Sequence, residues 1–475
     1  MDEISSTTNY IKVKSFKLLT AEKIAKLKTK VLEKLEESSS HGLPRILKSK
    51  LAFLKLFWAV CFLASICSCS YMILSGLFEY LDYDIVSKIV KIHEAKSLFP
   101  AVTICNTNAL ATANARDLVN KTIHTYFSNR ANDTDLSFIF ALDERSRMIA
   151  YEKSFGDENR RLLGFSLTEM VILCLFNEKY CHLKYFKWSF DLRYGNCFTF
   201  NYEQNSSMSI NMPGPDSGLS LFLYLPAGEN PKSYAYDEGF KMFIHNSTEK
   251  PYFAGGIGLG LSKSHDIIIE REFVNNYPYP YSSCLSLEAF DSTYFRFIKN
   301  LNGVYRQQDC LELCYQQQIA QKCNCYSLYY INMFDVAPCL TNDEIDCANQ
   351  QYEAFKWSDN KKECFELCPK ECSSINYGVF ASSTNYPSDS FYDSMKETFN
   401  FNFERNASIR ERLLVVNIFY SELAYTVISE SPKYTIIDLF SKLGGFLGLF
   451  AGLSMLSVVE IVELVIELVL ILFKK

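Results

Sequence analysis

Two long apolar segments, one near each end of the chain, constrain the fold of this sequence more than any other feature. The first contains an uncharged run of 23 residues, Leu56 to Phe78, which is long enough to cross a bilayer as a helix. The second extends from about Tyr434 to Phe473, and its uncharged part, Leu443 to Val459, covers 17 residues before acidic residues begin. We therefore expect two membrane-spanning helices, which place both chain termini on the same side.

The distribution of basic residues predicts which side that is. Residues 1–50 hold eleven Lys and Arg against six Asp and Glu, and Lys474 and Lys475 close the other end, so the positive-inside rule places both termini in the cytosol. The polar first 50 residues show no cleavable signal peptide, so the first span is expected to act as the insertion signal in the plasma membrane. The expected parts are a cytosolic segment 1–50, a first span 51–78, an extracellular domain 79–433, a second span 434–473 and a cytosolic end 474–475.

Cysteine usage supports an extracellular location for the middle segment. Three of the 17 cysteines, Cys61, Cys67 and Cys69, lie in the first span. The other fourteen lie between the spans, most densely in 284–372: Cys105, Cys174, Cys181, Cys197, Cys284, Cys310, Cys314, Cys323, Cys325, Cys339, Cys347, Cys364, Cys368 and Cys372. An even number in an oxidising compartment indicates seven disulfides. Zinc is the competing interpretation, but these cysteines lack nearby His partners and C-x2-C pairs, so we expect no metal site.

Other motifs agree with an exported protein and exclude several functions. Five glycosylation sequons lie in the middle segment, at Asn120, Asn132, Asn205, Asn246 and Asn406. The net charge of −6 argues against a nucleic-acid partner. We find no Gly-rich phosphate loop, nucleophile elbow or metal-ligand cluster, so we expect neither an enzyme nor a cofactor.

Residue periodicity predicts several secondary-structure elements. Apolar residues at helical spacing in 21–37 predict an amphipathic cytosolic helix that touches anionic lipid or a partner. The run from Arg412 to Glu430 is rich in β-branched and aromatic residues, which predicts a long strand leading into the second span. Further strands are expected at Leu219 to Leu225, Lys241 to His245 and Asp266 to Glu272, and helices at Gln307 to Gln321 and Asn360 to Leu367.

A stripe of acids interrupts the second apolar segment. Helical geometry puts Glu460, Glu463 and Glu467 on one face, with Ser457 on its flank. A charge that faces lipid at mid-membrane costs about 3 kcal/mol or more, so this stripe should face a bundle interior or a water-filled path. The alternative is that the membrane segment starts earlier and the glutamates form a solvated helix end in the cytosolic headgroup region.

Several sequence pieces occur in the order known from one protein family. They are His41-Gly42 before the first span, FPAVTICN at 99–106, YGNCFTFN at 194–201, the cysteine cluster, and Gly452-Leu-Ser454 after LGG at 443–445. Together they resemble the degenerin/epithelial sodium channel family over almost the whole chain. The resemblance implies a membrane α+β fold with two transmembrane helices per subunit and a large disulfide-rich ectodomain. It also implies a β-rich palm, a helical finger and thumb, and a trimer around one cation pore.

The resemblance further implies a disulfide pattern, which sequence spacing alone cannot choose. The implied pairs are Cys105 with Cys197, Cys174 with Cys181, Cys284 with Cys372, Cys310 with Cys368, Cys314 with Cys364, Cys323 with Cys347, and Cys325 with Cys339. It also implies that Gly452, Leu453 and Ser454 form the selectivity filter, where carbonyls or the Ser454 hydroxyl replace part of an ion's hydration shell. For an isolated G-x-S run, helix packing is the alternative explanation.

The resemblance assigns the remaining pore residues as well. His41 and Gly42 would form a gating motif that can re-enter and line the pore. Ser441 aligns with the small position where bulky substitutions hold family channels open. Lys442 departs from the pattern, because some proton-gated members have an acid there, so divalent block and the outer amiloride site do not carry over directly. The expected pore lining is Asp438, Ser441, Lys442, Gly445, Gly448, Ser457, Glu460, Glu463 and Glu467, with Asp438 as outer negative ring and the three glutamates enriching cations.

The functional hypothesis is a trimeric, sodium-permeable, amiloride-sensitive channel, homomeric or with related subunits, opened by an extracellular RFamide-type neuropeptide. Na⁺ is the expected permeant ion, and the sequence does not set its preference over Ca²⁺. The short finger between 106 and 190 and the ESSSHGLPRI context resemble the peptide-gated branch of cnidarians and molluscs. A proton-gated or force-gated member is an alternative, although six His mark no proton-sensing cluster. A non-conducting surface receptor and, on topology alone, an ATP-gated channel are the others.

Overall fold

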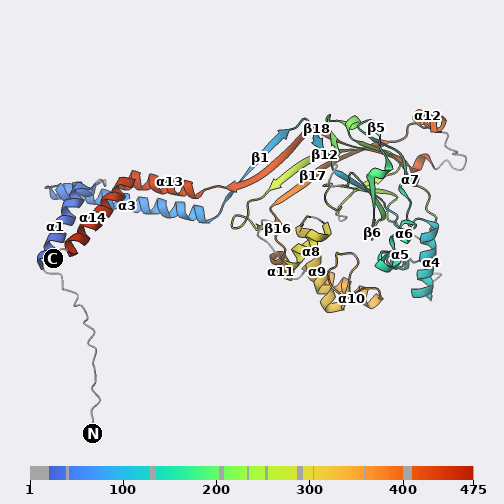
Figure 1. The fold of residues 1–475 in the computed structure, drawn as a ribbon, viewed down its shortest axis with the longest axis horizontal. Coiled ribbons are helices and arrows are strands. Elements are labelled where there is room, and N and C mark those ends of the chain that lie inside the picture. Colours follow the sequence, from blue (N-terminus) through green and yellow to red (C-terminus); the bar gives the residue numbers. More distant parts are fainter. Residues whose placement is uncertain are drawn as a thin grey trace, which may run out of the picture. The chain divides into compact units, whose positions relative to one another are not determined.

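The computed structural model describes residues 21–38, 42–128, 135–202, 208–232, 235–251, 255–285, 292–302, 304–357, 360–399 and 409–473. The chain forms two compact units (Figure 1). The helical unit comprises Met1–Val86 and Pro432–Lys475, and the ectodomain unit comprises Ser87–Ser431.

The helical unit contains five α-helices and one π-helical turn among the described residues. They are α1 (Ala21–Glu37), α2 (Leu43–Lys48), α3 (Ala52–Leu81), α13 (Ile436–Phe446), the π turn (Leu447–Ala451) and α14 (Met455–Phe473). Within the described chain, α3 is the one helix long and apolar enough to cross a membrane. The second apolar segment fails that test because it is divided and because α14 carries three glutamates.

The division of the second apolar segment is made by Gly452, which has a left-handed backbone with φ of 66°. Its N–H donates to the Gly448 carbonyl at 3.1 Å, and the next N–H, of Leu453, donates to the Leu447 carbonyl at 3.1 Å. This pattern closes a helix C-terminus and favours glycine, which has no Cβ to oppose a positive φ. We expected a continuous transmembrane helix over 434–473, and within this range the structure has two helices, α13 and α14, with the π turn and residues 452–454 between them.

Helix α3 supplies donors to the interrupted segment beside it. Figure 1 shows α3 alongside α13, and α1 alongside α14. The Ser65 hydroxyl donates to the Phe450 carbonyl at 2.7 Å, and the Cys69 thiol lies 3.7 Å from the Phe446 carbonyl. Irregular backbone at membrane depth requires such partners because lipid offers no hydrogen bonds.

Two large sheets form the core of the ectodomain unit, with buried residues such as Phe99, Phe200, Leu221, Ile267 and Ile418 packed into one cluster. One sheet has the order β17 (Ser373–Asn385), β12 (Lys263–Asn275), β18 (Leu413–Pro432), β9 (Leu219–Tyr224), β4 (Val171–Phe176) and β5 (Lys179–Tyr180), with β1 (Ile85–His93) also beside β18. The other has the order β11 (Ile257–Gly260), β10 (Gly239–His245), β3 (Ala101–Asn106), β7 (Gly195–Phe200) and β6 (Phe186–Asp191).

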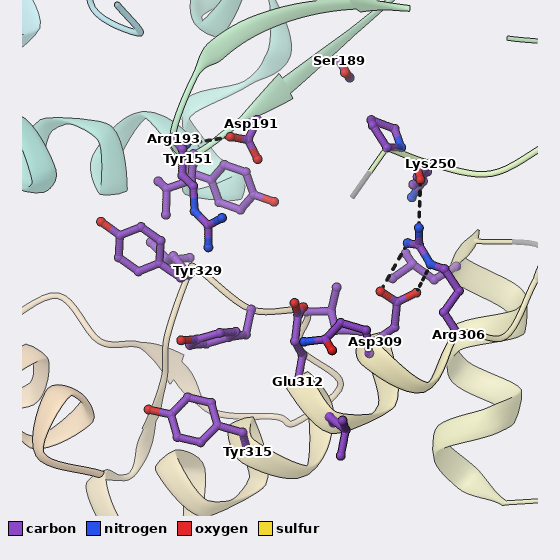
Figure 2. A pocket seen from close by; sticks show the side chains of 18 of the residues that line it. Tyr151, Ser189, Asp191, Arg193, Lys250, Arg306, Asp309, Glu312, Tyr315 and Tyr329 are labelled. Carbon is purple, nitrogen blue, oxygen red and sulfur yellow. Dashed lines mark hydrogen bonds and ion pairs between the residues drawn. The ribbon is translucent and has the colours of Figure 1, made fainter. Parts of the chain in front are cut away.

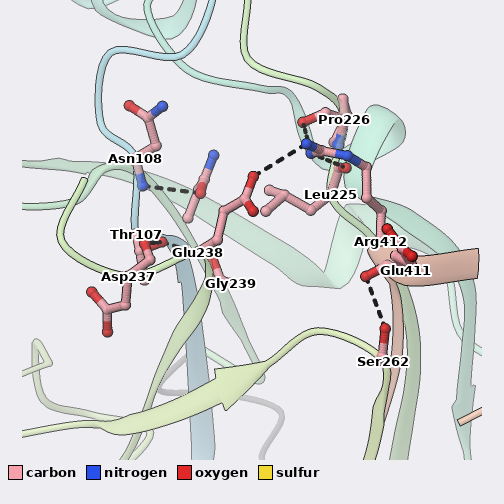
Figure 3. A network of polar contacts seen from close by, with 11 residues as sticks. Thr107, Asn108, Leu225, Pro226, Asp237, Glu238, Gly239, Ser262, Glu411 and Arg412 are labelled. Atoms are coloured by element: carbon pink, nitrogen blue, oxygen red, sulfur yellow. Dashed lines mark hydrogen bonds and ion pairs between the residues drawn. The ribbon is translucent and has the colours of Figure 1, made fainter. Parts of the chain in front are cut away.

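Strand β18 leads directly toward α13, and its first residues are firmly anchored. It runs parallel to β12 and antiparallel to β9. The Arg412 guanidinium, just before the strand, donates to the carbonyls of Leu225 at 3.3 Å and Pro226 at 3.2 Å and to the Glu238 carboxylate at 3.2 Å (Figure 3). The Ser262 hydroxyl donates to the Glu411 carbonyl at 3.0 Å in the same network.

The helices of the ectodomain unit fall mainly into two groups, one within residues 106–190 and one within residues 284–372. The first group is α4 (Ala113–Tyr126), α5 (Leu136–Tyr151), α6 (Asp157–Arg161) and α7 (Leu167–Met170). The second is α8 (Thr293–Asn302), α9 (Gln307–Cys323), α10 (Asn342–Trp357) and α11 (Asn360–Leu367). Helix α12 (Asp389–Phe399) follows β17, and three small sheets pair β2 (Ser97–Leu98) with β8 (Ser209–Ile210), β13 (Cys284–Leu285) with β16 (Lys370–Glu371), and β14 (Cys325–Tyr326) with β15 (Ala337–Pro338).

Seven disulfides hold the ectodomain unit together. They are Cys105–Cys197, Cys174–Cys181, Cys284–Cys372, Cys310–Cys368, Cys314–Cys364, Cys323–Cys347 and Cys325–Cys339. These are the same pairs that the family resemblance implied. Five of them lie in the segment that carries α8 to α11, where helices too small for a large core of their own are stapled together.

Candidate functional site

The expected filter, Gly452 to Ser454, is the short connection between the π turn and α14. The Ser454 N–H donates to the Ser457 hydroxyl at 3.1 Å, and the Ser457 N–H donates back to the Ser454 carbonyl at 3.0 Å. Ser457 is only 3% exposed. Through these two hydrogen bonds Ser457 stabilises the conformation of Ser454 in the expected filter. This structural role of Ser457 was not predicted from the sequence.

The outer part of the second segment is organised by α13. Thr435 caps this helix, and its N–H and hydroxyl donate to the Asp438 carboxylate at 2.9 and 2.7 Å. Asp438 remains exposed, as does Ser441, whose hydroxyl donates to the Ile437 carbonyl at 2.8 Å. The expected ring residue Asp438 thus also holds the helix N-terminus, where a negative charge is favourable.

Lys442 has a specific partner on the first apolar helix. Its ammonium lies 3.0 Å from the Glu79 carboxylate and 3.6 Å from the centre of the Tyr434 ring. The sequence analysis noted Lys442 as a departure from the family pattern, and Glu79 was not among its expected residues. The Glu79 carboxylate therefore neutralises the positive charge of Lys442. Near it, Gly445 has open space where a Cβ would lie, and a Cβ on Gly448 would meet the Leu453 carbonyl oxygen at an ordinary 3.8 Å.

The acidic stripe of α14 contacts the amphipathic helix α1. Lys34 Nζ lies 3.2 Å from Glu463 Oε1, and Lys30 Nζ lies 3.6 Å from Glu467 Oε2. Glu460 lies one helical turn closer to the expected filter. Neither lysine was singled out from sequence, although the two lysines share the four-residue spacing of the two glutamates. That shared spacing is the signal that could have found them.

Gly42 of the expected gating motif precedes helix α2 and lies beside Phe62 of α3, and His41 is outside the described residues. Gly42 has φ of 90°, and a Cβ there would lie 3.3 Å from the Phe62 ring. Arg45 stacks over Trp58, with its guanidinium carbon 4.9 Å from the ring centre. The positive φ and the close approach to Phe62 both favour glycine at position 42, where helix α2 begins.

Two of the expected glycosylation sites can be placed. Asn120 is exposed on α4. Asn246 follows β10, is half-buried, and donates its side-chain amide to Glu249 at 3.1 Å. Asn132, Asn205 and Asn406 lie outside the described residues.

A cavity of about 790 Å³ lies within the ectodomain unit. Figure 2 shows it between the β6–β7 hairpin, with Ser189, Asp191 and Arg193, and helix α9, with Asp309, Glu312 and Tyr315. Ten aromatic side chains line it, among them Tyr151, Trp188, Tyr202, Tyr315, Tyr329, Tyr330 and Tyr352. Its charged lining residues are the cations Lys187, Arg193, Lys250, Arg306, Lys356 and Lys361 and the acids Asp191, Asp309 and Glu312. This cavity was not predicted from the sequence, because its walls come from segments separated by more than two hundred residues, from Tyr151 to Phe365.

Two acids of helix α9 in the cavity wall, Asp309 and Glu312, differ in their ion pairing. Arg306 holds Asp309 through two nitrogens at 2.9 and 3.2 Å and also donates to the Lys250 carbonyl at 3.2 Å (Figure 2). Glu312 makes no ion pair with any residue in the described parts of the chain, and burial, with the nearby Asp309 carboxylate, raises the pKa of Glu312 to about 7. The Glu312 carboxylate can therefore bind a cation or a proton.

A second acid and a tyrosine complete the upper wall. Burial raises the pKa of Asp191, while its carboxylate accepts the N–H groups of Arg193 at 2.8 Å and Tyr194 at 3.1 Å. The Tyr329 hydroxyl donates to Glu144 at 2.7 Å, and burial raises the pKa of this tyrosine. All three groups are thus engaged in the protein's own hydrogen bonds, because Glu312 also accepts one from the backbone N–H of Ile331.

Comparisons with known proteins identify the family. Residues 35–464 match the family model described as amiloride-sensitive sodium channel. Acid-sensing ion channel 1C of Danio rerio is 24% identical over 90% of this chain and 82% of its own length. The FMRFamide-activated amiloride-sensitive sodium channel of Cornu aspersum is 25% identical over 91% of this chain and 82% of its own length.

A third kind of relative aligns over a shorter stretch. Epithelial sodium channel subunit alpha of Rattus norvegicus is 30% identical over 66% of this chain, which spans 45% of that protein. These relatives are ion channels and not enzymes, and the disulfide-rich, β-rich ectodomain agrees with them. Because the family model matches most of its length, the chain belongs to the amiloride-sensitive sodium channel family.

Proposed function

We propose that three copies of this chain, or this chain with related subunits, form an amiloride-sensitive, sodium-permeable channel that an extracellular peptide opens. The ectodomain cavity carries the proposal. Its volume of about 790 Å³ falls in the range of small-ligand sites, and it combines aromatic walls with the Glu312 carboxylate. An RFamide-type peptide end offers a guanidinium, an aromatic ring and an uncharged amide, and these groups suit such walls by ion pairing and ring stacking.

In this proposal the chain crosses the plasma membrane twice, with α3 as the first span and the interrupted α13–α14 segment as the second. From Ile436 to Glu463 a helical rise of about 1.5 Å per residue gives about 40 Å, which exceeds a hydrocarbon core of about 30 Å. The break at Gly452 then falls inside the membrane, where irregular backbone is tolerated beside protein or water. Three such breaks around an axis would form the filter, and Glu463 and Glu467 would reach the inner interface.

Covalent continuity supports a route from ligand to pore. Strand β18 ends at Pro432 and α13 begins at Ile436, so three residues connect the central sheet strand to the proposed pore helix. Arg412 anchors the other end of β18 to two carbonyls and one carboxylate. A ligand that changes the spacing of the walls around Glu312 would move strands packed against β18 and thereby turn α13.

A specific observation favours protons as a second candidate stimulus. The pKa of Glu312 is raised to about 7, so this group changes charge within the physiological range. Uptake of a proton by Glu312 would remove one negative charge from the cavity wall. A proton-gated channel would therefore use the same cavity.

Expression in oocytes tests these proposals. We expect an RFamide peptide to evoke an inward current that amiloride blocks, and Glu312→Gln to raise the peptide concentration for half-activation roughly tenfold, as expected for losing a charged hydrogen bond. Glu366→Gln, an exposed acid of α11 outside the cavity, is the matched control. Current evoked by acid alone would favour the second candidate. A surface-expressed chain that gives no current under any stimulus would favour a non-conducting receptor.

A further inference from the structure

Two ion pairs join helices α1 and α14 in one antiparallel register. Lys30 and Lys34 are one helical turn apart in α1, as Glu463 and Glu467 are in α14. The later lysine meets the earlier glutamate, with Lys34 Nζ 3.2 Å from Glu463, and the earlier lysine, Lys30, lies 3.6 Å from Glu467. The two contacts support each other, because a single helix orientation satisfies both.

In this register, oppositely charged residues face each other over two helical turns. One turn further along, it brings the acid Glu37 to the level of Glu460, where the charges are alike. Lysine is thus placed opposite the two glutamates farthest from the expected filter. The hydrogen bond with Glu463 raises the pKa of Lys34, so this lysine stays charged at physiological pH.

These pairs are only partly shielded from water. The side chains of Lys34 and Glu463 are 24% and 56% exposed, and those of Lys30 and Glu467 are 34% and 30% exposed. Ion pairs at this exposure are weak and sensitive to salt. These ion pairs can therefore form and break reversibly. When they form, they neutralise Glu463 and Glu467 of α14.

We propose that Lys30 and Lys34 of helix α1 determine conductance and calcium permeability by neutralising Glu467 and Glu463 at the inner end of the pore. The inference rests on the proposed channel function. With α1 in contact, Glu463 and Glu467 in each subunit are compensated, so fewer cations collect at the inner mouth. With α1 released, the full negative ring is exposed and favours divalent ions most.

A proximity experiment tests the contact without requiring current. Residues 409–475 contain no cysteine, and all seven disulfides lie before residue 373. A protease site inserted at 400–408 of the full-length protein would therefore release a C-terminal fragment with no disulfide to the remainder. In Lys34→Cys/Glu463→Cys, a short bifunctional thiol reagent applied to membranes should keep the two fragments together on a gel.

Two controls make the proximity result specific. Glu463→Cys alone reports any reaction with the native Cys61, Cys67 and Cys69, and Lys34→Cys/Val462→Cys places the thiol about 100° away on α14. Linkage of Lys34→Cys/Glu463→Cys well above both controls supports the inference. Equal linkage in all three, or none in any, would overturn it.

Single-channel recording tests the consequence. We expect Lys34→Gln to raise inward sodium conductance by roughly 1.5- to 2-fold and to increase calcium permeability, because the neutralised acid becomes available to cations. Lys28→Gln, an exposed lysine of the same helix, is the matched control and should change neither. The charge exchange Lys34→Glu/Glu463→Lys restores an ion pair at this position, so its conductance should lie closer to that of the unchanged channel than the conductance of Lys34→Gln does.

The two arms separate failure of the inference from failure of the proposed function. Unchanged conductance in Lys34→Gln, or an equal change in Lys28→Gln, would overturn the role of the lysines while leaving the channel intact. Absence of current in every variant would refute the proposed function, and the linkage result would then decide the α1–α14 contact alone.

Discussion

The Ser457 hydroxyl accepts the N–H of Ser454 at 3.1 Å, three residues before it, at the point where the second apolar segment is interrupted. The reciprocal bond from the Ser457 N–H to the Ser454 carbonyl closes the turn. Because Ser457 is almost fully buried, no water can replace its hydroxyl easily. The side chain that sets the shape of the proposed filter is therefore not one that the sequence motif itself contains.

Replacing that hydroxyl should disturb ion selection. In Ser457→Ala the Ser454 N–H loses its partner, which costs about 1–3 kcal/mol for a buried donor. We expect a lower ratio of sodium to potassium permeability, measured from reversal potentials. Ser457→Thr retains a hydroxyl and should keep most of the selectivity, whereas equal behaviour of both variants would show that the hydrogen bond is not needed.

The left-handed backbone at Gly452 gives a second test. An alanine at φ of 66° costs about 1–2 kcal/mol, so Gly452→Ala should alter conductance or abolish it. Gly445→Ala is the matched control, because Gly445 lies in helix α13 with open space where its Cβ would be placed. Recording both at equal surface expression measures the difference. Normal currents in Gly452→Ala would contradict the assignment of this turn to the filter.

Glu312 should make the stability of the ectodomain depend on pH. Its pKa is raised from an ordinary 4.5 to about 7 in the folded protein, so between these values the folded state binds more protons than the unfolded state. Stability therefore falls as pH rises through that window and levels off above about 7. The melting temperature of the purified protein should fall from about pH 5 to about pH 8 more steeply than that of Glu312→Gln. Parallel curves would mean that the carboxyl is not buried as described.

The loss of folding stability on removing a disulfide should depend on the length of the loop that the bond closes. Cys105 and Cys197 are 92 residues apart, and Cys174 and Cys181 are 7 apart. Chain entropy assigns about 4–5 kcal/mol to the long loop and about 2–3 kcal/mol to the short one. The double serine variant of the first pair should reduce surface expression much more than that of the second. The reverse order would contradict this account.

Local patterns in the sequence predicted much of the fold. The helix expected over 21–37 is α1, the run from Arg412 to Glu430 became strand β18 (Leu413–Pro432), and the expected Asn360 to Leu367 is α11. Such elements depend on side-chain periodicity and composition, which a single sequence carries. The strand expected at Asp266 to Glu272 was shorter than β12 (Lys263–Asn275), because pairing with β17 and β18 extends it at both ends.

What the sequence missed depends on residues far apart along the chain. The contact of Lys34 with Glu463 joins segments more than four hundred residues apart. The same holds for Glu312, whose raised pKa depends on the walls that bury it. Periodicity describes neighbours on one element and cannot specify such contacts.

The most direct test of the proposed function is the reversal potential of the expressed protein while sodium outside the cell is replaced by a large organic cation. We expect a peptide-evoked, amiloride-blocked current whose reversal potential moves to more negative voltage when sodium is removed. A protein that reaches the surface yet carries no current with peptide or acid, even with a bulky residue in place of Ser441, would contradict it.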